Sequence, residues 1–469
     1  MRRNEAKPIG CRKLPAHGGK IFYAGLISIL ASNNAMAELP QGGFIQTCER
    51  LNGITGTAPT TLSNAQSNFK AICSGPAGGV AGISDANDNT AVSALRHEEA
   101  AAGGTTTSQS SQKQVSNLRE RMDEVREEDT TASSDLLENS RRSFFINGGF
   151  RNGEAKKTSD ETGFGNGVTA GTPTDPERAT IVQGERAFDI DGQEVTVGMD
   201  YRLEDEQTIV GASLGFDRRE AKFTDQSALD DSGNIIEGGV ESKGTYISGY
   251  VTRALSDTAY LDGVISVGNS DLTITRPVPK INTTGDGPAA TYDTATGKPG
   301  STQFSASLGG GKDILYDDVT ITPYARVDYT RTSIDAYEES LPTASEGMAL
   351  RVAKQEADSL LGTVGVKASK PMRTEAGTVF VPQASIEIGH EFSNDPRNIE
   401  ATLVAADGLT GIDPSVVRTS DPDRNHAKLG FGVSAVFSKG RSGFVQFETI
   451  QGNDQYSDAS VRVGYRVEF

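Results

Sequence analysis

The sequence predicts an all-β protein, an antiparallel β-barrel of about twelve strands that spans a membrane and is preceded by a short helical region. Three observations lead to this prediction. From Ser143 onward, apolar and polar residues alternate with a period of two in one segment after another. Short polar turns and long loops join these segments in turn. Beyond residue 37, no apolar stretch approaches the roughly 20 residues of a membrane helix, so strands would have to cross the membrane.

Residues 1–37 have the pattern of a secretory signal peptide. The basic segment MRRNEAKPIGCRKLPAHGGK precedes the apolar run IFYAGLISILAS, and AMA supplies the small residues of a cleavage site. A membrane anchor is the alternative, but the apolar run is too short to cross a bilayer. We expect cleavage after Ala37 and export of the mature chain.

Residues 38–111 are expected to form a short N-terminal region with helix starts and one flexible stretch, AAAGGTTTSQSSQ. This region contains Cys48 and Cys73, the two cysteines that remain after export. In an oxidising compartment a disulfide between them is expected, and two free buried thiols are the alternative. The region contains no internal repeat.

Residues 112–142 are predicted to form a linker helix and a connector. In QKQVSNLRERMDEVREED, one helical stripe carries the apolar residues Val115, Leu118, Met122 and Val125. So narrow a stripe is typical of a surface helix or of a coiled-coil seam. Ahead of a barrel, the helix could instead lie in the lumen, where its charges would meet lumen-facing charges of the strands. The predicted lumen-facing charges are Arg326, Asp328, Glu387, Glu448, Arg462 and Arg466.

Residues 143–469 are predicted to form the barrel. Strands are expected to begin near Ser143, Glu194, Thr208, Val240, Ala259, Ser301, Val319, Met348, Thr378, His426, Gly443 and Ala459. An even number lets an antiparallel sheet close with both chain ends on one side. Because every backbone group must be paired in hydrocarbon, the last strand must pair with the first.

A secreted β-sandwich is the alternative, since alternation alone fits both folds. The polar positions are mostly Gly, Ser, Thr and single charges, and bulky aromatic residues occur near the strand ends. Both features favour a barrel with a wet or plugged lumen and an aromatic girdle.

Charge and motifs argue against several classes of function. With 45 Lys+Arg against 63 Asp+Glu, the net charge is -18, which argues against a nucleic-acid partner. Ser213 lies in GASLG, which matches a nucleophile motif, but it is placed mid-strand and not on a sharp turn. His390 and Glu391 are half of a zinc motif whose second histidine is missing. The aspartate-rich loops could hold divalent cations shared with lipopolysaccharide, although solvated loops are the simpler interpretation. No catalytic residue, cofactor or metal site is expected.

From Gln112 to Phe469 the chain resembles the translocator domain of autotransporters, the type V secretion barrels of Gram-negative bacteria. The resemblance lies in five segments that occur in family order: FFINGGFRNGEAKKT, VTVGMDYRL, TPYARVDYTRTSIDAYEE, GTVFVPQASIEIGHEF and VRVGYRVEF. It implies a twelve-stranded barrel with the preceding helix in its lumen. It also implies insertion by the barrel-assembly machinery, which reads the final strand. The residues at the position of that signal are Val463, Tyr465, Val467 and Phe469.

The linker QVSNLRERMDEVRE resembles that of the serine-protease autotransporters, in which the chain is cut between two adjacent asparagines. Here the pair is Ser116 and Asn117, so one asparagine is missing and we predict an uncut chain. A typical passenger of the family is a long repetitive β-helix, which the short region ahead of the linker cannot form.

The expected function is therefore to anchor or export a short N-terminal region at the Gram-negative outer membrane, without bond chemistry. The barrel is expected to be monomeric and to contact outer-membrane lipid and lipopolysaccharide. Two alternatives remain open at this point, a passengerless porin-like channel and a surface adhesin that acts through the long loops.

Overall fold

The computed structural model describes most of the chain beyond the predicted signal peptide. The described residues are 40–53, 62–74, 97–131, 141–155, 188–205, 207–223, 228–280, 291–343, 345–375, 377–419, 422–453 and 456–469. Residues 1–37 lie outside them. Helices α1 (Pro40–Gly53), α2 (Asn64–Ser74) and α4 (Glu98–Thr131) precede the first strand.

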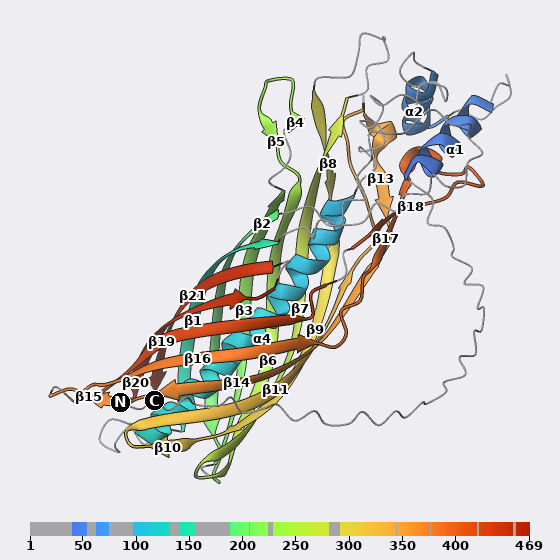
Figure 1. Ribbon diagram of the computed structural model, residues 1–469. Coiled ribbons are helices and arrows are strands. Elements are labelled where there is room, and N and C mark those ends of the chain that lie inside the picture. Colours follow the sequence, from blue (N-terminus) through green and yellow to red (C-terminus); the bar gives the residue numbers. More distant parts are fainter. Residues whose placement is uncertain are drawn as a thin grey trace, which may run out of the picture. The chain divides into compact units, whose positions relative to one another are not determined.

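Twelve antiparallel strands form a closed barrel (Figure 1). In order they are β1 (Arg142–Ala155), β2 (Phe188–Arg202), β3 (Thr208–Phe223), β6 (Gly239–Ser256), β7 (Ala259–Pro279), β9 (Gly300–Lys312), β11 (Val319–Ile334), β14 (Gln355–Ser369), β16 (Val379–Glu391), β19 (Asn425–Phe437), β20 (Arg441–Gln451) and β21 (Tyr456–Glu468). Each strand pairs with its neighbours along the chain. The ring closes where β1 pairs with β21, from Ser143 opposite Glu468 to Ala155 opposite Tyr456. The predicted barrel of about twelve strands is confirmed.

The connections divide the barrel into a turn end and a loop end. At the turn end, which also holds Phe469, the connections include the short turns 203–207, 257–258 and 438–440. At the loop end the long connections are 156–187, 224–238, 280–299, 335–354 and 392–424. The loop-end connection between β20 and β21 is short, at 452–455, and so departs from the expected alternation.

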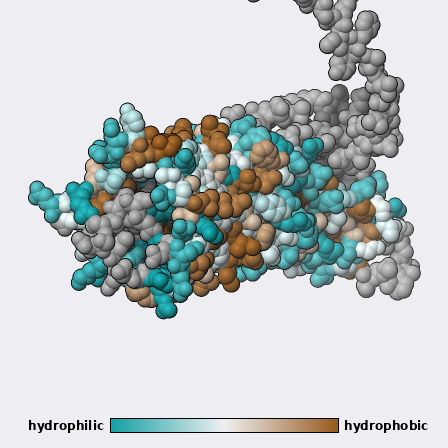
Figure 2. Space-filling model, turned by 90° about the horizontal axis from the view of Figure 1, so that it is seen from below, coloured by the Kyte–Doolittle hydropathy of each residue, from teal (hydrophilic) through white to brown (hydrophobic). Residues whose placement is uncertain are grey.

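Over most of their length the strands present apolar side chains outward and polar side chains inward. On β2, Val195 and Met199 are 44% and 50% exposed, whereas the residues that follow them, Thr196 and Asp200, are 0% and 5% exposed. Figure 2 shows apolar side chains in brown on the outer face of the barrel. Such outward rows suit contact with hydrocarbon, as an outer-membrane barrel requires.

Near the loop end this pattern reverses. On β2, Phe188 and Ile190 point inward and are 0% exposed, while Asp189 and Asp191 are exposed. Phe188 and Ile190 belong to an apolar core to which β7 also contributes Leu272 and other buried residues. The strand ends therefore behave as strands of a water-soluble domain, with apolar residues inside.

Aromatic rings lie over glycines on the lumen face. A Cβ atom on Gly198 would lie 2.5 Å from the ring of Phe145, and one on Gly464 would lie 2.0 Å from the ring of Phe444. Only glycine leaves room for these rings on the neighbouring strand. Some of the lumen-facing glycines thus make room for aromatic side chains inside the barrel. The sequence pattern had placed the aromatic residues mainly in the outer girdle.

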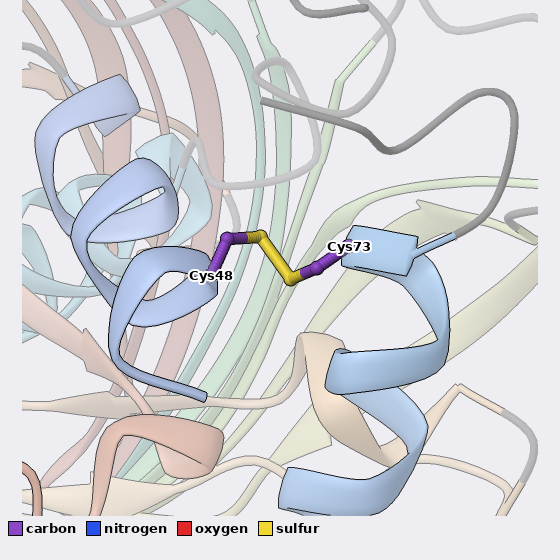
Figure 3. The surroundings of a disulfide bond; sticks show 2 residues. All are labelled: Cys48 and Cys73. Atoms are coloured by element: carbon purple, nitrogen blue, oxygen red, sulfur yellow. A yellow bond between two sulfur atoms is a disulfide. The ribbon is translucent and has the colours of Figure 1, made fainter. Parts of the chain in front are cut away.

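The short helical region packs on two of the long loops. Those loops fold into β12 (Tyr337–Glu338), η3 (Glu346–Met348), β13 (Leu350–Val352), β17 (Asn398–Leu403), η4 (Val404–Ala406) and β18 (Ser415–Arg418). Their four strands form a separate sheet in the order β12-β13-β17-β18. We call this sheet, η3, η4, α1 and α2 the cap. The predicted disulfide is present: Cys48 of α1 is bonded to Cys73 of α2 (Figure 3).

Helix α4 runs through the barrel lumen (Figure 1) and contacts strands from β2 to β14. It begins at Glu98 and not near Gln112, so the stretch expected to be flexible is helical. Two of its hydroxyl groups bond within the helix: Thr107 Oγ1 donates to the carbonyl oxygen of Gly103 at 2.7 Å, and Ser110 Oγ donates to that of Thr106 at 3.2 Å. Tertiary packing here outweighs the weak helix propensity of Gly, Thr and Ser. Among the described residues, no helix is both long and apolar enough to cross a bilayer.

Candidate functional site: the occupied lumen

The apolar stripe of α4 faces the barrel wall. Val115, Leu118, Met122 and Val125 are at most 3% exposed. The first three of them form a cluster with Phe145 of β1, Tyr250 of β6 and Val264 of β7. The stripe therefore packs inside the barrel, and it is neither a surface face nor a coiled-coil seam.

Arg121 of α4 is a fully buried charge of the lumen, at 0% exposed. Its guanidinium forms an ion pair with Asp200 of β2, and its Nε donates to Asp200 Oδ2 at 3.0 Å. Nη1 donates to Glu124 Oε2 at 3.0 Å. Asp200 also accepts hydrogen bonds from Ser143 Oγ, at 2.7 Å, and from the hydroxyl of Tyr250. A buried pair of this kind strongly opposes removal of either partner, because the other charge is left uncompensated.

One turn further along, Arg126 repeats this arrangement against β7. Its Nη1 donates to both carboxylate oxygens of Asp262 at 2.8 Å. Its guanidinium carbon lies 3.6 Å from the ring centroid of Tyr260, which is cation–π geometry. Together Arg121 and Arg126 fix the C-terminal half of α4 near the turn end.

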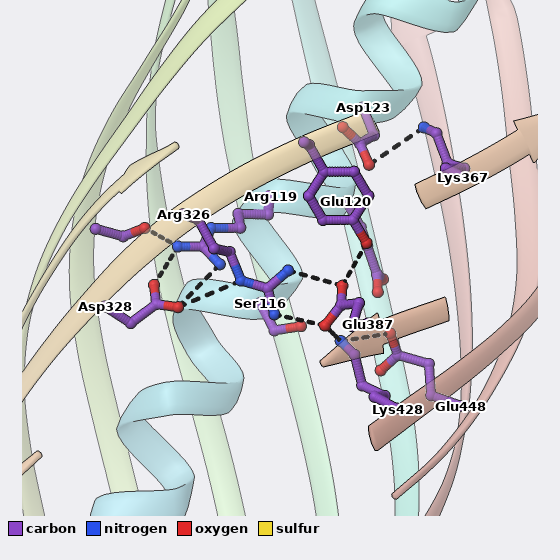
Figure 4. A network of polar contacts seen from close by, with 12 residues as sticks. Ser116, Arg119, Glu120, Asp123, Arg326, Asp328, Lys367, Glu387, Lys428 and Glu448 are labelled. Carbon is purple, nitrogen blue, oxygen red and sulfur yellow. Dashed lines mark hydrogen bonds and ion pairs between the residues drawn. The ribbon is translucent and has the colours of Figure 1, made fainter. Parts of the chain in front are cut away.

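A belt of charges lies beside α4 in the lumen (Figure 4). Arg326 of β11 forms a bidentate pair with Glu387 of β16, with both Nη–Oε distances at 2.7 Å. Lys428 of β19 bridges Glu387 and Glu448, at 3.2 Å and 3.1 Å. From the helix, Arg119 pairs with Asp328.

The six predicted lumen charges thus have different partners. Asp328, Glu448 and Arg462 contact α4, through Arg119, Lys113 and Glu120 respectively. Arg326 and Glu387 pair with each other across strands. Arg466 pairs with Glu468 of its own strand at 2.7 Å.

Sequence reasoning missed several charges that hold the helix. Asp200, Asp262 and Lys367 pair with Arg121, Arg126 and Asp123 of α4. Lys428 of the belt was also missed. The signal was available for Asp200, because the alternation of VTVGMDYRL already places this residue on the polar face. An ionisable residue on the inward face of any strand was a candidate partner for a lumen helix.

The four residues of the predicted assembly signal lie on β21 and at its end. Val463, Tyr465 and Phe469 are 48%, 44% and 58% exposed on the outer surface, and Val467 is half-buried. The backbone N–H of Phe469 donates to the carbonyl oxygen of Arg142 at 3.0 Å, so this end is paired with the start of β1.

The residues that matched catalytic or metal-binding motifs do not form a site with one another. Ser213 is buried in the middle of β3. His390 is exposed and bonds to Asn425 Oδ1 through Nδ1 at 2.9 Å, whereas Glu391 is buried and accepts from Ser359 Oγ at 2.6 Å. Within the described ranges, no group of three or more His, Cys, Asp or Glu side chains is placed to hold a metal ion.

A comparison with protein families decides the assignment. The model of the autotransporter beta-domain matches residues 177–448, which is more than half of the 469 residues. The chain belongs to this family. Autotransporter β-domains are outer-membrane secretion barrels of Gram-negative bacteria.

Several solved structures of autotransporter barrels resemble the chain. The translocator domain of NalP from Neisseria meningitidis shares 17% identity, with a TM-score of 0.49 over 78% of this chain and 99% of that one. The β-domain of BrkA from Bordetella shares 19%, with a TM-score of 0.46 over 70% of this chain and 100% of that one. The transport unit of AIDA-I from Escherichia coli shares 13%, with a TM-score of 0.42 over 71% and 91%. At these values the likenesses carry no argument of their own. No curated protein matches the chain.

Proposed function

We propose that this autotransporter barrel carries its own N-terminal segment across the outer membrane and keeps it attached there. One observation carries the proposal: α4 runs through the lumen between a cap at the loop end and β1, which begins at the turn end. Ala100 to Ala102 of α4 belong to the core of the cap. Arg121, near the other end, donates to Ser143 Oγ at the start of β1 at 3.3 Å. The chain ahead of α4 is thus on the opposite side of the barrel from the start of the first strand.

The exported segment is held on the loops of the barrel. Leu51 of α1 and Phe69 of α2 are both 0% exposed, and they share one core with Leu350 and Ile399 of the loops. Burial of each such side chain contributes about 1.5–3 kcal/mol relative to exposure. Burial also raises the pKa of Tyr337 in this core well above its ordinary value, so its phenol stays neutral. Helices α1 and α2, which we call the hairpin, and the loops therefore stabilise each other.

Polar contacts and a close approach fix the hairpin at one position. Gln46 Nε2 donates to Asp413 Oδ2, and the backbone N–H of Asp413 donates to Gln46 Oε1, both at 2.8 Å. A Cβ atom on Gly347 would lie only 2.8 Å from the backbone nitrogen of Phe69. So close an approach of α2 to η3 requires glycine. A passenger built to be released would have no need of such a fit.

The proposal also states how the barrel is oriented in the membrane and what it contacts. The loop end faces the cell exterior, and the outward rows contact outer-membrane lipid and lipopolysaccharide. Residues 1–37 direct export and are removed, and the barrel-assembly machinery reads Val463, Tyr465, Val467 and Phe469. The barrel acts as a monomer, without a nucleic-acid partner and without bond chemistry.

A protease site on intact cells tests the direction of export. The site is inserted between residues 54 and 61, which connect α1 and α2. As a matched control, the same site is inserted at 438–440 in the turn between β19 and β20. We expect the hairpin site to be cut on intact cells and the control site to be cut only after the outer membrane is permeabilised. Protection of the hairpin site until permeabilisation would contradict the proposal.

Retention on the loops is tested separately with Gly347→Val. We expect the hairpin site to be cut faster than in the unchanged protein, because the added side chain forces α2 away from η3. Gly53→Val is the control, since a Cβ atom there meets nothing within 4 Å. Equal rates for the two variants would show that docking at Gly347 does not hold the hairpin.

A further inference from the structure

A groove lies on the outer wall of the barrel where the ring closes. It has a volume of about 620 Å³ and crosses neighbouring strands from β20 through β21, β1 and β2 to β3. Three of the side chains that line it, Phe150, Phe447 and Val461, are 66%, 41% and 44% exposed. They belong to the outward apolar rows, so the groove opens toward the lipid and not toward the lumen.

One row of directly paired residues crosses this groove and changes from apolar to cationic. Phe447 is opposite Val461, which is opposite Phe150. Phe150 is in turn opposite Gln193, and Gln193 is opposite Arg218. Because barrel strands are tilted, such a row runs obliquely to the membrane plane. The row therefore leaves the hydrocarbon after Phe150 and reaches the polar layer at Arg218.

The neighbouring residues of β2 and β3 place the same boundary. On the turn-end side of Gln193 and Arg218, Val195 and Phe216 are opposite each other and are 44% and 49% exposed. On the loop-end side, Asp191 is exposed. A lipid whose headgroup contacts Arg218 can thus lay its acyl chains on apolar side chains directly below it.

Arg218 is one of two cations that share a single carboxylate. It is directly opposite Lys243 of β6, and both side chains are 62% exposed. Glu241 lies 2.8 Å from Arg218 and 3.1 Å from Lys243. One positive charge therefore remains at this edge of the groove, where a phosphate can accept hydrogen bonds from both side chains.

Two carboxylates at the loop-end edge of the groove limit where an anion can bind. Asp191 and Glu220 are opposite each other on β2 and β3. Asp191 accepts from Asn152 Nδ2 at 2.9 Å, and Glu220 pairs with Lys222 at 3.3 Å. Because both carboxylates repel a phosphate, the anion is directed to the side of Arg218 and away from the loops.

We propose that this groove binds lipopolysaccharide, with one lipid A phosphate on Arg218 and Lys243 and the acyl chains on Phe150 and its apolar neighbours. Five strands at about 4.8 Å spacing give a width of roughly 19 Å, which suits several acyl chains side by side. This breadth favours lipid A over a glycerophospholipid with two chains. The proposal rests on the orientation proposed above, because lipopolysaccharide occupies the outer leaflet and the groove lies on the loop-end side of the lipid-facing rows.

Native mass spectrometry of delipidated full-length protein in detergent, titrated with lipid A, tests the headgroup contact. We expect Arg218→Gln/Lys243→Gln to weaken binding roughly tenfold, because two charged donors to the phosphate are lost. Arg331→Gln is the matched control, since Arg331 is an exposed arginine of β11 outside the groove and lies 2.6 Å from Glu356. Equal affinities of these variants for lipid A would overturn the proposal.

A second pair of variants tests the acyl contact, and other ligands test the choice of lipid. Phe150→Ala should weaken lipid A binding roughly threefold, whereas Phe304→Ala, at an outward position of β9 outside the groove, should not. We expect phosphatidylglycerol to bind at least roughly tenfold more weakly than lipid A, and inorganic phosphate not to compete. Equal binding of phosphatidylglycerol would show a general site for anionic lipids and overturn the assignment to lipopolysaccharide. These titrations use no cells, so their failure leaves the export proposal to the protease test.

Discussion

Replacement of Asp200 by Asn tests what holds α4 in the lumen. The change removes the carboxylate charge opposite Arg121, which is 0% exposed, and also alters the acceptor of Ser143 and Tyr250. Breaking a buried ion pair costs about 3–5 kcal/mol. Because Glu124 remains as a second partner of Arg121, we expect the lower end, about 3 kcal/mol. At a factor of ten for every 1.4 kcal/mol, the undocked helix becomes roughly 10²-fold more populated.

Trypsin cleavage within α4 measures that population, since cutting tracks the open state when opening and closing are fast. We expect the rate in purified Asp200→Asn protein to rise roughly 10²-fold. Asp271→Asn makes the same chemical change on the exposed face of β7 and should leave the rate unchanged. Replacing the pair by Arg121→Met/Asp200→Leu should restore part of the protection, because the fully buried guanidinium is removed together with its main partner. Equal rates for Asp200→Asn and Asp271→Asn would refute the reasoning.

Three further predictions follow from the cap, the helix and the barrel wall. In the variant Cys48→Ser/Cys73→Ser the disulfide is lost, and its two cysteines are 25 positions apart in the sequence. The greater chain entropy of the unfolded state should lower the stability of the cap by about 3.5 kcal/mol. We expect proteases to cut the hairpin faster in this variant. The chain should remain uncut within α4, so the purified mature protein should give one full-length mass, and a barrel-sized fragment would contradict this. Gly198→Val should drive the ring of Phe145 off β2 and lower the fraction that migrates as a folded barrel without boiling, whereas Gly148→Ala, with its nearest contact at 3.7 Å, should not.

The strands were predictable because two different solvents act on their two faces. An alternation with period two follows from lipid outside and a polar lumen inside, and it located β11 at Val319 and β7 at Ala259. The alternation mislocated a strand start where the chain leaves the barrel wall and enters the cap. The start expected near Met348 is in fact Gln355, because the alternating residues Leu350–Val352 belong to the cap strand β13.

The cap and the details of the lumen were not predictable from local pattern. Strands of two to six residues, such as Tyr337–Glu338 and Asn398–Leu403, carry too little periodicity to be recognised. The docking of Gln46 on Asp413 joins residues 367 positions apart, and no local signal announces it. The lumen face of α4 was visible as an apolar stripe, and three of the six strand charges expected to face it do contact the helix. Its charge partners depend on strand register and on the rotation of the helix.

The reversal of polarity along β2 marks the height of the bilayer on the barrel. The outward lipid-facing row ends at Val195, while Phe188 to Gln193 have a soluble pattern. At about 3.4 Å per residue, those six residues extend roughly 20 Å along the strand, or about 15 Å along the membrane normal at a usual tilt. With the loop end outside, as proposed, this polar ring of strand ends would lift the cap above the phosphate groups into the sugar layer of lipopolysaccharide. Antibodies and phages that approach the cell would then meet the disulfide-bonded hairpin before they reach the lipid.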